Sequence, residues 1–474
     1  MVSADLDLCY MTATEAISKF KAKELSPVEL MAAVIARCEE VNPKVNALTY
    51  TFFERALDQA KKAEARYMKT DGRTRALEGI PTAIKDFHSV KGEITTLGSK
   101  IYADTRSDNT APTIERLFRA GAIMHCRTTT PEFAHSGTTK SPLWGITRNP
   151  WNLDYSSGGS SGGAGAAVAA GMTTVADGTD GGGSIRIPSS ACGIFGYKPP
   201  FGRNPLDREH PYESILHYGP MARSVADAAL MQNVMSGPHE VDICSLRNRL
   251  RLPQTFEGIK GWKVALSPNL GFNEIDPEVE ANTRHAVQVF ESLGCTVEEV
   301  DLAWDYSVMD AWLTHWEGLF WAVAGELYPR WRYEMDPFVA SILEQGRGHN
   351  AARMYNVNAV RGEMYKTLAP VLSKYDILIT PTLCVPAVKA DHDDADPDFT
   401  INGKKVPAYL GWIQTYPFNL MSQCPVASVP SGLSQSGVPT GLQIIAKTYD
   451  DMSVFRAACA FEAARPWRGN RPGI

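Results

Sequence analysis

Apolar side chains recur at helical spacing through the first seventy residues. Thr12 with Glu15, and Ser26 with Glu29, have the spacing of a capping box, in which a hydroxyl side chain opens a helix and an acidic residue three positions later bonds back to it. From Leu30 onward, apolar residues follow every four positions, as on the buried face of a helix. The N-terminal part of the chain is therefore predicted to be helical.

Beyond this region, short apolar runs alternate with longer amphipathic stretches. Short runs flanked by Gly, Pro or polar residues predict strands, and the amphipathic stretches predict helices. Strands are predicted at 78–90, 122–126, 262–266, 295–302 and 375–382 and in the runs PVASVP and GLQIIA. Helices are predicted at 111–120, 164–171, 276–294, 306–368 and 450–464, with a surface loop at 386–405. The alternation favours an α/β fold built on a central sheet.

The chain shows no internal repeat, and no linker rich in Pro, Gly or Ser divides it into halves. A single domain is therefore predicted, although the length alone would also fit two or three. Its predicted parts are an N-terminal helical segment 1–70, a core 75–235, a variable middle 240–370 and a closing core 371–474, which together make up the one domain 1–474.

Composition and charge narrow the possible partners. The chain is 44% hydrophobic and 21% charged, and its net charge of −6 without a basic stripe argues against nucleic acid. No secretory signal is evident and no apolar run reaches the ~20 residues that span a bilayer, so no membrane partner is expected. Nine scattered cysteines without a CxxC pair predict neither a zinc site nor a disulfide framework. Dispersed thiols of this kind fit a cytoplasmic protein.

The chemistry is concentrated between Gly158 and Ser189, in GGSSGGAGAAVAAGMTTVADGTDGGGSIRIPS. Two Gly-Ser clusters are joined there by small residues, and Ser160 and Ser184 lie 24 positions apart. Successive glycines allow a turn whose N–H groups point into one space, which can bind an oxyanion. Lys85, 75 positions before Ser160, stands in an apolar run that would desolvate its amine. Each feature alone also fits a glycine turn, a flexible linker or a surface lysine.

The segment from Gly158 to Gly162 also satisfies G-x-S-x-G, the nucleophile elbow of α/β-hydrolases. That motif requires a strand directly before it and a helix after it. The preceding residues, NPWNLDYSS, indicate a polar turn instead. An α/β-hydrolase-type serine esterase is kept as an alternative.

The two serine clusters, together with GIPTAIKD around Lys85, resemble the amidase signature family. Strings similar to the family extend from Gly79 to about Ala229 and return in YDILITPT and near the C-terminus. The resemblance implies one large α/β domain with a mixed central β-sheet sandwiched by α-helices. Gly181 is a departure, because many members carry a bulkier residue there.

By this resemblance, Ser184 is the nucleophile, Ser160 follows a cis peptide bond and relays the proton, and Lys85 is the base. The resemblance also implies that Gly181, Gly182 and Gly183 form the oxyanion hole. Asp180 and Arg186 flank this loop, and we interpret them as structural supports that orient its backbone amides through charge-assisted hydrogen bonds. Lys85 must be neutral to act, and burial would lower its pKa toward the useful range of ~7–8. The implied reaction is hydrolysis of a carboxylic amide through an acyl-enzyme, without cofactor or metal. Esters and carbamates (urethanes) are further implied substrates.

Aromatic and histidine side chains outside these motifs are candidates for the substrate pocket. Trp316 and Phe320 follow Trp312 at four-residue intervals on one face of a predicted helix. Such a stripe forms either a core or a hydrophobic wall beside the substrate, and both interpretations stay open. His135 and His217 are the other candidates, although each also fits an ordinary surface or core histidine.

Two further functions stay open. One is the A subunit of a tRNA-dependent amidotransferase, which needs partner chains; those relatives carry an SLDQIGP-type segment where this chain has SILHYGPM. The other is a non-catalytic scaffold on the same fold, against which the presence of all three implied residues speaks. For the hydrolase, the expected partner is a small-molecule amide, ester or carbamate, and the enzyme is expected to be a monomer or homodimer.

Overall fold

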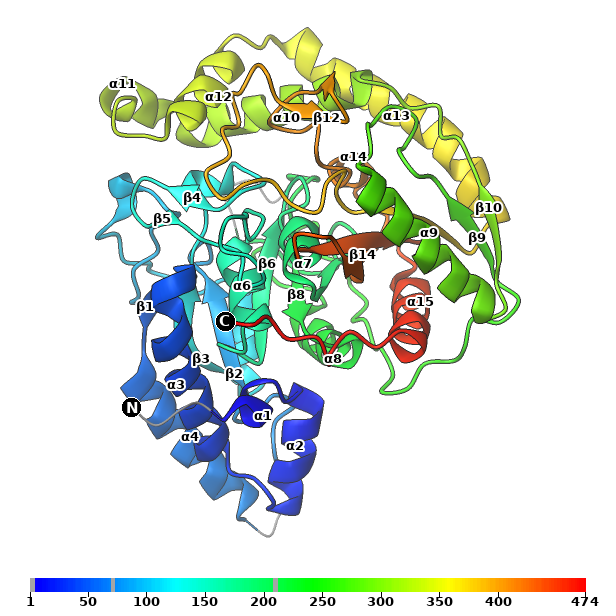
Figure 1. Ribbon diagram of the computed structural model, residues 1–474. Coiled ribbons are helices and arrows are strands. Elements are labelled where there is room, and N and C mark those ends of the chain that lie inside the picture. The colour runs from blue at the N-terminus through cyan, green and yellow to red at the C-terminus, as the bar shows by residue number, and fades with distance from the viewer. Residues whose placement is uncertain (1–4, 70–72, 208–211) are drawn as a thin grey trace.

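The computed structural model describes residues 5–69, 73–207 and 212–474. Its centre is a mixed sheet whose strands run in the order β1-β3-β2-β6-β8-β7-β14-β15-β11-β9-β10 (Figure 1). The strands of this sheet are β1 Leu48–Thr51, β2 Pro81–Lys85, β3 Ile123–Thr128, β6 Val175–Asp180, β7 Phe195–Lys198, β8 His217–Ala222, β9 Lys263–Leu266, β10 Thr296–Glu299, β11 Ile377–Pro381, β14 Val426–Leu433 and β15 Pro439–Ile445. Two small hairpins lie outside it, β4 Lys140–Ser141 with β5 Gly145–Ile146 and β12 Thr400–Ile401 with β13 Lys404–Lys405.

Helices surround this sheet. The α-helices are α1 Leu6–Cys9, α2 Ala13–Ala22, α3 Pro27–Val45, α4 Phe53–Tyr67, α5 Pro112–Arg119, α6 Gly162–Ala169, α7 Arg186–Cys192, α8 Val225–Met235, α9 Pro277–Ser292, α10 Ser307–Ala324, α11 Tyr328–Trp331, α12 Pro337–Arg347, α13 Ala351–Lys374, α14 Pro417–Leu420 and α15 Asp451–Ala464. Short 3-10 turns occur at η1 Lys100–Tyr102, η2 Glu132–Ala134 and η3 Gly325–Leu327.

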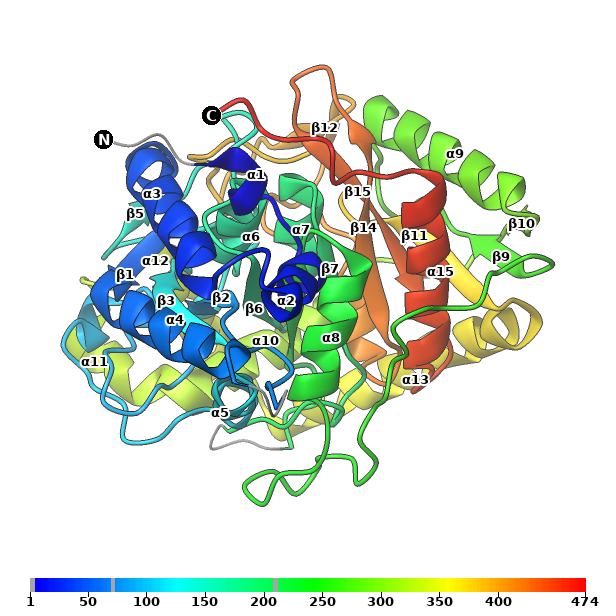
Figure 2. The ribbon, with the colours of Figure 1, turned by 90° about the horizontal axis from the view of Figure 1, so that it is seen from below.

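Two adjacent residues of β7 show that helices cover both faces of the sheet. The ring of Tyr197 packs on Phe455 of α15, with centroids 4.6 Å apart. Its neighbour Gly196 faces α7, because a Cβ built at Gly196 would lie 2.0 Å from Ser189 Oγ. Successive strand residues point to opposite faces, so α7 and α15 lie on opposite sides. The view from below shows α8 and α15 on the same side of the sheet, where the two helices pack against each other (Figure 2).

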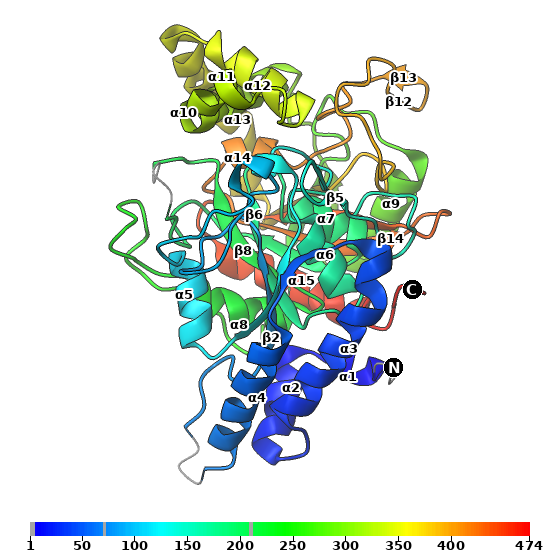
Figure 3. The same ribbon diagram turned by 90° about the vertical axis from the view of Figure 1, so that its left-hand side faces the viewer.

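The helices α10, α11, α12 and α13 form a cap on one edge of the sheet. Figures 1 and 3 both show this cap away from α1 to α4, which lie at the opposite edge. Helix α10 packs against α12 and α13. Its buried residues share a hydrophobic core with α14 and β11, separate from the larger core beneath the N-terminal helices.

The predicted α/β fold with a mixed central sheet is confirmed. Both capping boxes form, at Thr12 with Glu15 and at Ser26 with Glu29. Each predicted strand corresponds to an observed strand, and each predicted helix to an observed helix, with ends that differ by a few residues, except that the predicted helical stretch 306–368 is divided into α10, α11, α12 and α13. However, β1, β6, β7 and β8 were not predicted, and the predicted loop 386–405 contains the β12–β13 hairpin.

Two further sequence expectations concern cysteines and membranes. All nine cysteines are free thiols, and seven of them are buried, which agrees with their interpretation as small apolar side chains. Across the described parts of the chain, no helix has the length and apolar character required to cross a membrane.

Candidate active site

Lys85 and the two serines come together at one edge of the sheet. Lys85 is the last residue of β2, which pairs in parallel with β6, so the carboxyl ends of both strands lie at this edge. Lys85 Nζ donates hydrogen bonds to Ser160 Oγ at 2.7 Å and to Thr179 Oγ1 at 2.7 Å. Ser184 follows β6, and the N–H of Ser161 donates to its carbonyl at 3.2 Å, which ties the two serine loops together.

Burial controls the protonation of Lys85. The side chain is fully buried, and this desolvation lowers its pKa to about 7, although the carboxylates of Asp177 and Asp180 act in the opposite direction. Asp177 Oδ1 accepts from the backbone N–H of Lys85 at 2.9 Å, and its Oδ2 lies 2.7 Å from Nε2 of His88. A lysine with such a pKa is partly neutral near pH 7 and can accept a proton there.

Asp86 directly follows Lys85, and its charge could oppose the neutral amine. Its carboxylate instead accepts from the backbone N–H of Thr96 at 3.0 Å and lies 3.6 Å from the guanidinium of Arg127. Asp86 is therefore held by other partners, and it is not one of the carboxylates that raise the pKa of Lys85.

The peptide bond between Gly159 and Ser160 is cis, as the resemblance predicted. Gly159 has no room for a side chain, because an added Cβ would lie 2.3 Å from the carbonyl oxygen of Thr138. Only glycine therefore fits before Ser160 at this close approach to a neighbouring backbone.

The loop 181–184 is held through its carbonyl groups. Trp312 Nε1 donates to the carbonyl of Gly181 at 3.0 Å, and Thr415 Oγ1 donates to that of Gly182 at 2.5 Å. Backbone N–H groups donate to the remaining two carbonyls. Within the described residues, no hydrogen bond uses the four N–H groups of this loop as donors. These N–H groups are therefore free to receive an oxyanion.

Asp180 and Arg186 support this loop from beneath. Arg186 Nε and Nη2 donate to the two oxygens of Asp180 at 3.0 and 2.8 Å, and both side chains are fully buried. Burial would raise the pKa of Asp180, but the Arg186 guanidinium outweighs it and holds that pKa well below its usual range. Asp180 Oδ2 also accepts from the N–H of Ile185 at 3.2 Å. The pair thus fixes the backbone next to Ser184.

Ser160, Thr179, Gly181 and Ser184 open into a cavity of 540 Å³. Most of its other lining residues are apolar or aromatic; they include Phe87, Leu97, Tyr102, Phe133, Leu216, Trp316, Leu319, Phe320, Val323 and Ala324. The cavity has the size and lining typical of a pocket for a small apolar ligand.

The aromatic stripe of α10 contributes to both the core and the pocket. Trp312 and Trp316 are stacked with centroids 5.0 Å apart, and the rings of Trp316 and Phe320 are 4.7 Å apart. Trp316 and Phe320 line the cavity, whereas Trp312 holds the carbonyl of Gly181. A Cβ at Gly181 would lie 2.9 Å from the Trp316 ring. The missing side chain at Gly181 therefore makes room for Trp316.

The prediction that His135 and His217 line the substrate pocket was wrong for the cavity observed here. Neither belongs to its lining among the described residues. His135 Nδ1 lies 2.9 Å from the carbonyl oxygen of Glu132, and both rings are buried. His217 on β8 lies between the carbonyls of Asp180 and Ser422, and burial lowers its pKa to about 3. Both rings are structural because backbone carbonyls fix them inside the protein.

The nucleophile-elbow alternative does not match the structure. No strand leads into Gly158, since residues 149–158 form turns and isolated bridges. The hydrogen-bonding partner of Ser160 is a lysine, not a histidine. No group of three or more His, Cys, Asp or Glu side chains in the described ranges is placed to hold a metal ion.

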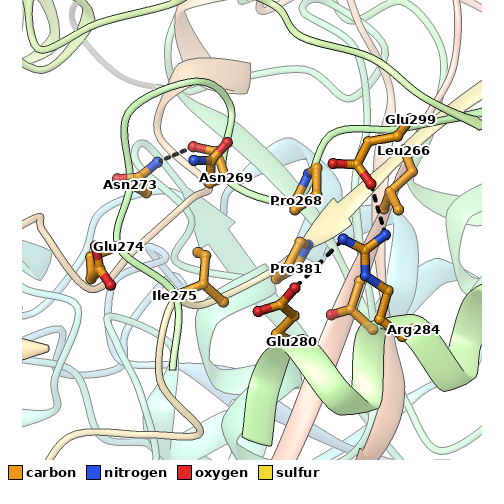
Figure 4. Close-up of a pocket in the computed structure, with 11 residues that line it drawn as sticks. Leu266, Pro268, Asn269, Asn273, Glu274, Ile275, Glu280, Arg284, Glu299 and Pro381 are labelled. Carbon is orange, nitrogen blue, oxygen red and sulfur yellow. Dashed lines mark hydrogen bonds and ion pairs between the residues drawn. The ribbon is translucent and has the colours of Figure 1, made fainter. Parts of the chain in front are cut away.

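A smaller cavity of 280 Å³ lies elsewhere, at the ends of β9 and β11 (Figure 4). Arg284 extends there between two carboxylates, 2.7 Å from Glu299 and 3.5 Å from Glu280. The carboxylates of Glu280 and Glu299 are paired with Arg284, and none of the described residues that line this cavity is a serine or lysine, so we place the candidate active site at Ser184.

Three site residues escaped the sequence interpretation: Thr179, Asp177 and Thr415. Thr179, like Ser160, accepts a hydrogen bond from Lys85 Nζ, and Asp177 accepts one from the backbone N–H of Lys85. Both belong to β6, which was not predicted; side chains two apart on a strand share a face, so recognising β6 would have revealed them. No signal in the sequence pointed to Thr415.

Comparisons with known proteins agree with this geometry. Residues 29–455 match the family model described as Amidase. An acylamidase of Rhodococcus erythropolis is 36% identical over 471 residues, covering 98% of each chain. The A subunit of the glutamyl-tRNA(Gln) amidotransferase of Geotalea daltonii is 33% identical, covering 99% of this chain and all of that one. The crystal structure of a bacterial aryl acylamidase of the amidase signature family superimposes with a TM-score of 0.91 at 32% identity, covering 97% of each chain.

Proposed function

The chain belongs to the amidase signature family, whose enzymes hydrolyse amides. From this premise we propose that it cleaves small-molecule amides through Ser184, Ser160 and Lys85. The observation that carries the proposal is the 2.7 Å hydrogen bond between Lys85 Nζ and Ser160 Oγ in a fully buried site. A buried amine with a pKa of about 7 is suited to take up and return a proton at neutral pH.

In the first half of the proposed reaction, Ser184 Oγ attacks the amide carbonyl carbon. Its proton passes to Ser160 Oγ, whose own proton passes to Lys85 Nζ. The N–H groups of the loop 181–184 receive the negative charge that forms on the carbonyl oxygen. As the C–N bond breaks, the leaving nitrogen takes a proton back through Ser160, which leaves an acyl ester on Ser184 and a neutral Lys85.

In the second half, water attacks the acyl carbon and gives its proton to the same relay. The ester bond breaks, and the proton returns to Ser184 Oγ. The carboxylic acid is released, and the site regains its starting protonation. Every proton in this scheme moves between groups of the chain, the substrate and water, so no cofactor is required.

The lining of the cavity favours an aromatic or bulky apolar substituent on the substrate. Trp316, Phe320, Phe133 and Leu97 lie along the cavity that contains Ser184. Two of the similar proteins are named acylamidase and aryl acylamidase. We therefore propose aryl amides as preferred substrates. Esters and aryl carbamates carry the same carbonyl next to a leaving oxygen or nitrogen, and they are proposed as further substrates.

The amidotransferase alternative is favoured by one observation, the 33% identity to an amidotransferase A chain over nearly the whole length. A chain of that kind would act in an assembly with partner chains. Turnover of simple amides by the isolated chain distinguishes the two functions.

The test uses purified protein with 4-nitroacetanilide, benzamide, 4-nitrophenyl butyrate and an aryl carbamate. Ser184→Ala, Ser160→Ala and Lys85→Ala variants are assayed beside the unmodified chain. We expect amide turnover that disappears in Ser184→Ala and falls by at least a factor of about 10³ in the other two. Turnover that survives in Lys85→Ala but not in Ser160→Ala would contradict the proposed relay. If the chain hydrolyses glutamine but none of the other amides, and does so only when partner chains are added, the result would support the amidotransferase.

A further inference from the structure

One wall of the cavity is built on unusual backbone conformations. Leu97, Phe133 and Ala134 all have positive φ, at 53°, 52° and 60°, and all three line the cavity. Residues with a Cβ rarely adopt this left-handed backbone conformation, and they keep it only where surrounding contacts hold the chain. The contacts that hold this wall therefore determine its shape.

The carboxylate of Glu132 supplies such contacts. Glu132 directly precedes Phe133 and is fully buried. Its Oε1 accepts from Ser99 Oγ at 2.5 Å, two residues after Leu97, and its Oε2 accepts from the backbone N–H of Asp336 at 2.6 Å. The N–H of Phe133 donates to the carbonyl of Leu97 at 2.7 Å. Both strained segments are thus tied to one buried side chain.

Through Asp336, the same carboxylate is connected to the helices that carry the aromatic side of the cavity. Asp336 is the N-cap of α12, and its own side chain accepts from the N–H of Phe338 at 2.9 Å. Helix α12 packs along α10, which carries Trp316 and Phe320 into the cavity. Glu132 therefore links the strained wall to the aromatic wall formed by α10.

We propose that Glu132 is a positioning residue that sets the width of the pocket and so selects substrates with a bulky aromatic substituent. The substrate class rests on the proposed function, whereas the positioning role of Glu132 rests on its contacts with Ser99 and Asp336. Glu132 has no part in the proton relay, because its two oxygens are occupied by Ser99 and Asp336. Its effect should appear in discrimination between large and small ligands.

Glutamine is the informative conservative replacement. Its amide oxygen can accept from the Asp336 N–H, and its NH₂ group can donate to the Ser99 hydroxyl, which is able to accept. Methionine has a similar length but supplies neither strong bond. Glu78→Met is the matched control, because Glu78 is also a fully buried carboxylate but binds Arg66 and Arg75 at the other end of β2.

The experiment measures binding in the full-length Ser184→Ala chain, so that it does not depend on turnover. Calorimetry gives the affinities of acetamide, acetanilide and benzamide, which differ by one ring on the amine or the acyl side. We expect Glu132→Met to reduce at least one aromatic-to-acetamide affinity ratio by about tenfold. Glu132→Gln should stay within about threefold of the parent, and Glu78→Met should leave both ratios unchanged.

Unchanged ratios in folded Glu132→Met protein would overturn the proposal, and so would an equal change in Glu78→Met. If Glu132→Met does not fold, Ser99→Ala removes one of the two bonds and should reduce the same ratio by about threefold; no change there overturns the proposal. Equal affinities of the Ser184→Ala chain for acetamide and for the aromatic ligands would also overturn the proposal. The expected changes in affinity ratio, found together with no amide turnover by the unmodified chain, would refute the proposed function and leave the positioning role of Glu132 supported.

Discussion

Replacing Lys85 with methionine should abolish turnover and at the same time make the stability of the chain less dependent on pH. Methionine keeps the length and the apolar stem of lysine and removes only the amine. Ser160 Oγ and Thr179 Oγ1 each lose one hydrogen bond, which costs about 1–3 kcal/mol per group at any pH. The loss of the titrating amine, in contrast, changes stability in a way that depends on pH.

The size of the pH-dependent effect follows from the pKa of Lys85. It falls from 10.5 to about 7 on folding because of burial. Between these values the unfolded chain binds the proton and the folded chain does not, so the folded state gains stability as the pH rises and loses it as the pH falls toward 7. The full effect is about 5 kcal/mol, at about 1.36 kcal/mol per pH unit. Of this, about 3 kcal/mol is recovered between pH 6 and pH 9.

The assay is equilibrium unfolding in urea, followed by tryptophan fluorescence at several values between pH 6 and pH 9. The free energy of unfolding of the unmodified chain, minus that of Lys85→Met, should increase by about 3 kcal/mol over this range.

Lys198→Met provides a close comparison, because Lys198 is equally buried with a pKa of about 7, bonds to the carbonyl of Cys424 and does not contact Ser160. It should show the same pH dependence and retain turnover. Lys366→Met, at an exposed position, should show no pH dependence. A pH-independent difference for Lys85→Met would refute the depressed pKa.

Three other predictions concern the same site. The value of kcat/KM should rise with pH and reach half its plateau near pH 7, because only neutral Lys85 acts as the base; a profile that is flat from pH 5 to pH 9 would exclude it. Arg186→Lys should lower the free energy of unfolding by about 3–5 kcal/mol, measured by urea denaturation, because buried Asp180 loses its bidentate hydrogen bonds from the guanidinium. Gly181→Ala should raise KM for aryl amides by displacing the Trp316 ring, and the double variant with Trp316→Leu should recover part of the loss.

The sequence predicted the apolar strands of the sheet better than the neighbouring strands β6, β8 and β7. Strands β9, β11, β14 and β15 are short apolar runs, and the pattern identifies them directly. Strands β6, β7 and β8 read VADGTD, FGYK and HYGPMA, which contain the Gly, Pro and Asp residues that strands disfavour. Pairing and burial on both faces impose the extended conformation there, and the local sequence carries little trace of those contacts.

At the site, residues that belong to a motif could be predicted from the sequence, whereas the orientation of a side chain could not. The lysine and the two serines stand in recognisable motifs, and the structure brings Lys85 and Ser160 into direct contact. The directions of His135 and His217 depend on which backbone carbonyls lie nearby, and no spacing in the sequence encodes this. The role of the aromatic stripe depends on the packing of α10 against Gly181, a contact between residues far apart in the sequence.

The separation of α10 from the serine loops along the chain has a consequence for how new specificities could arise. The groups proposed to break the bond come from residues 85–184, whereas the aromatic wall comes from a helix that begins at Ser307. Mutagenesis within the α10–α13 cap that keeps Trp312, which holds the carbonyl of Gly181, can therefore reshape the pocket without changing Lys85, Ser160 or Ser184. The cap is thus a natural unit for exchange between relatives, and chimeras that swap it offer a route to enzymes with new substrate ranges.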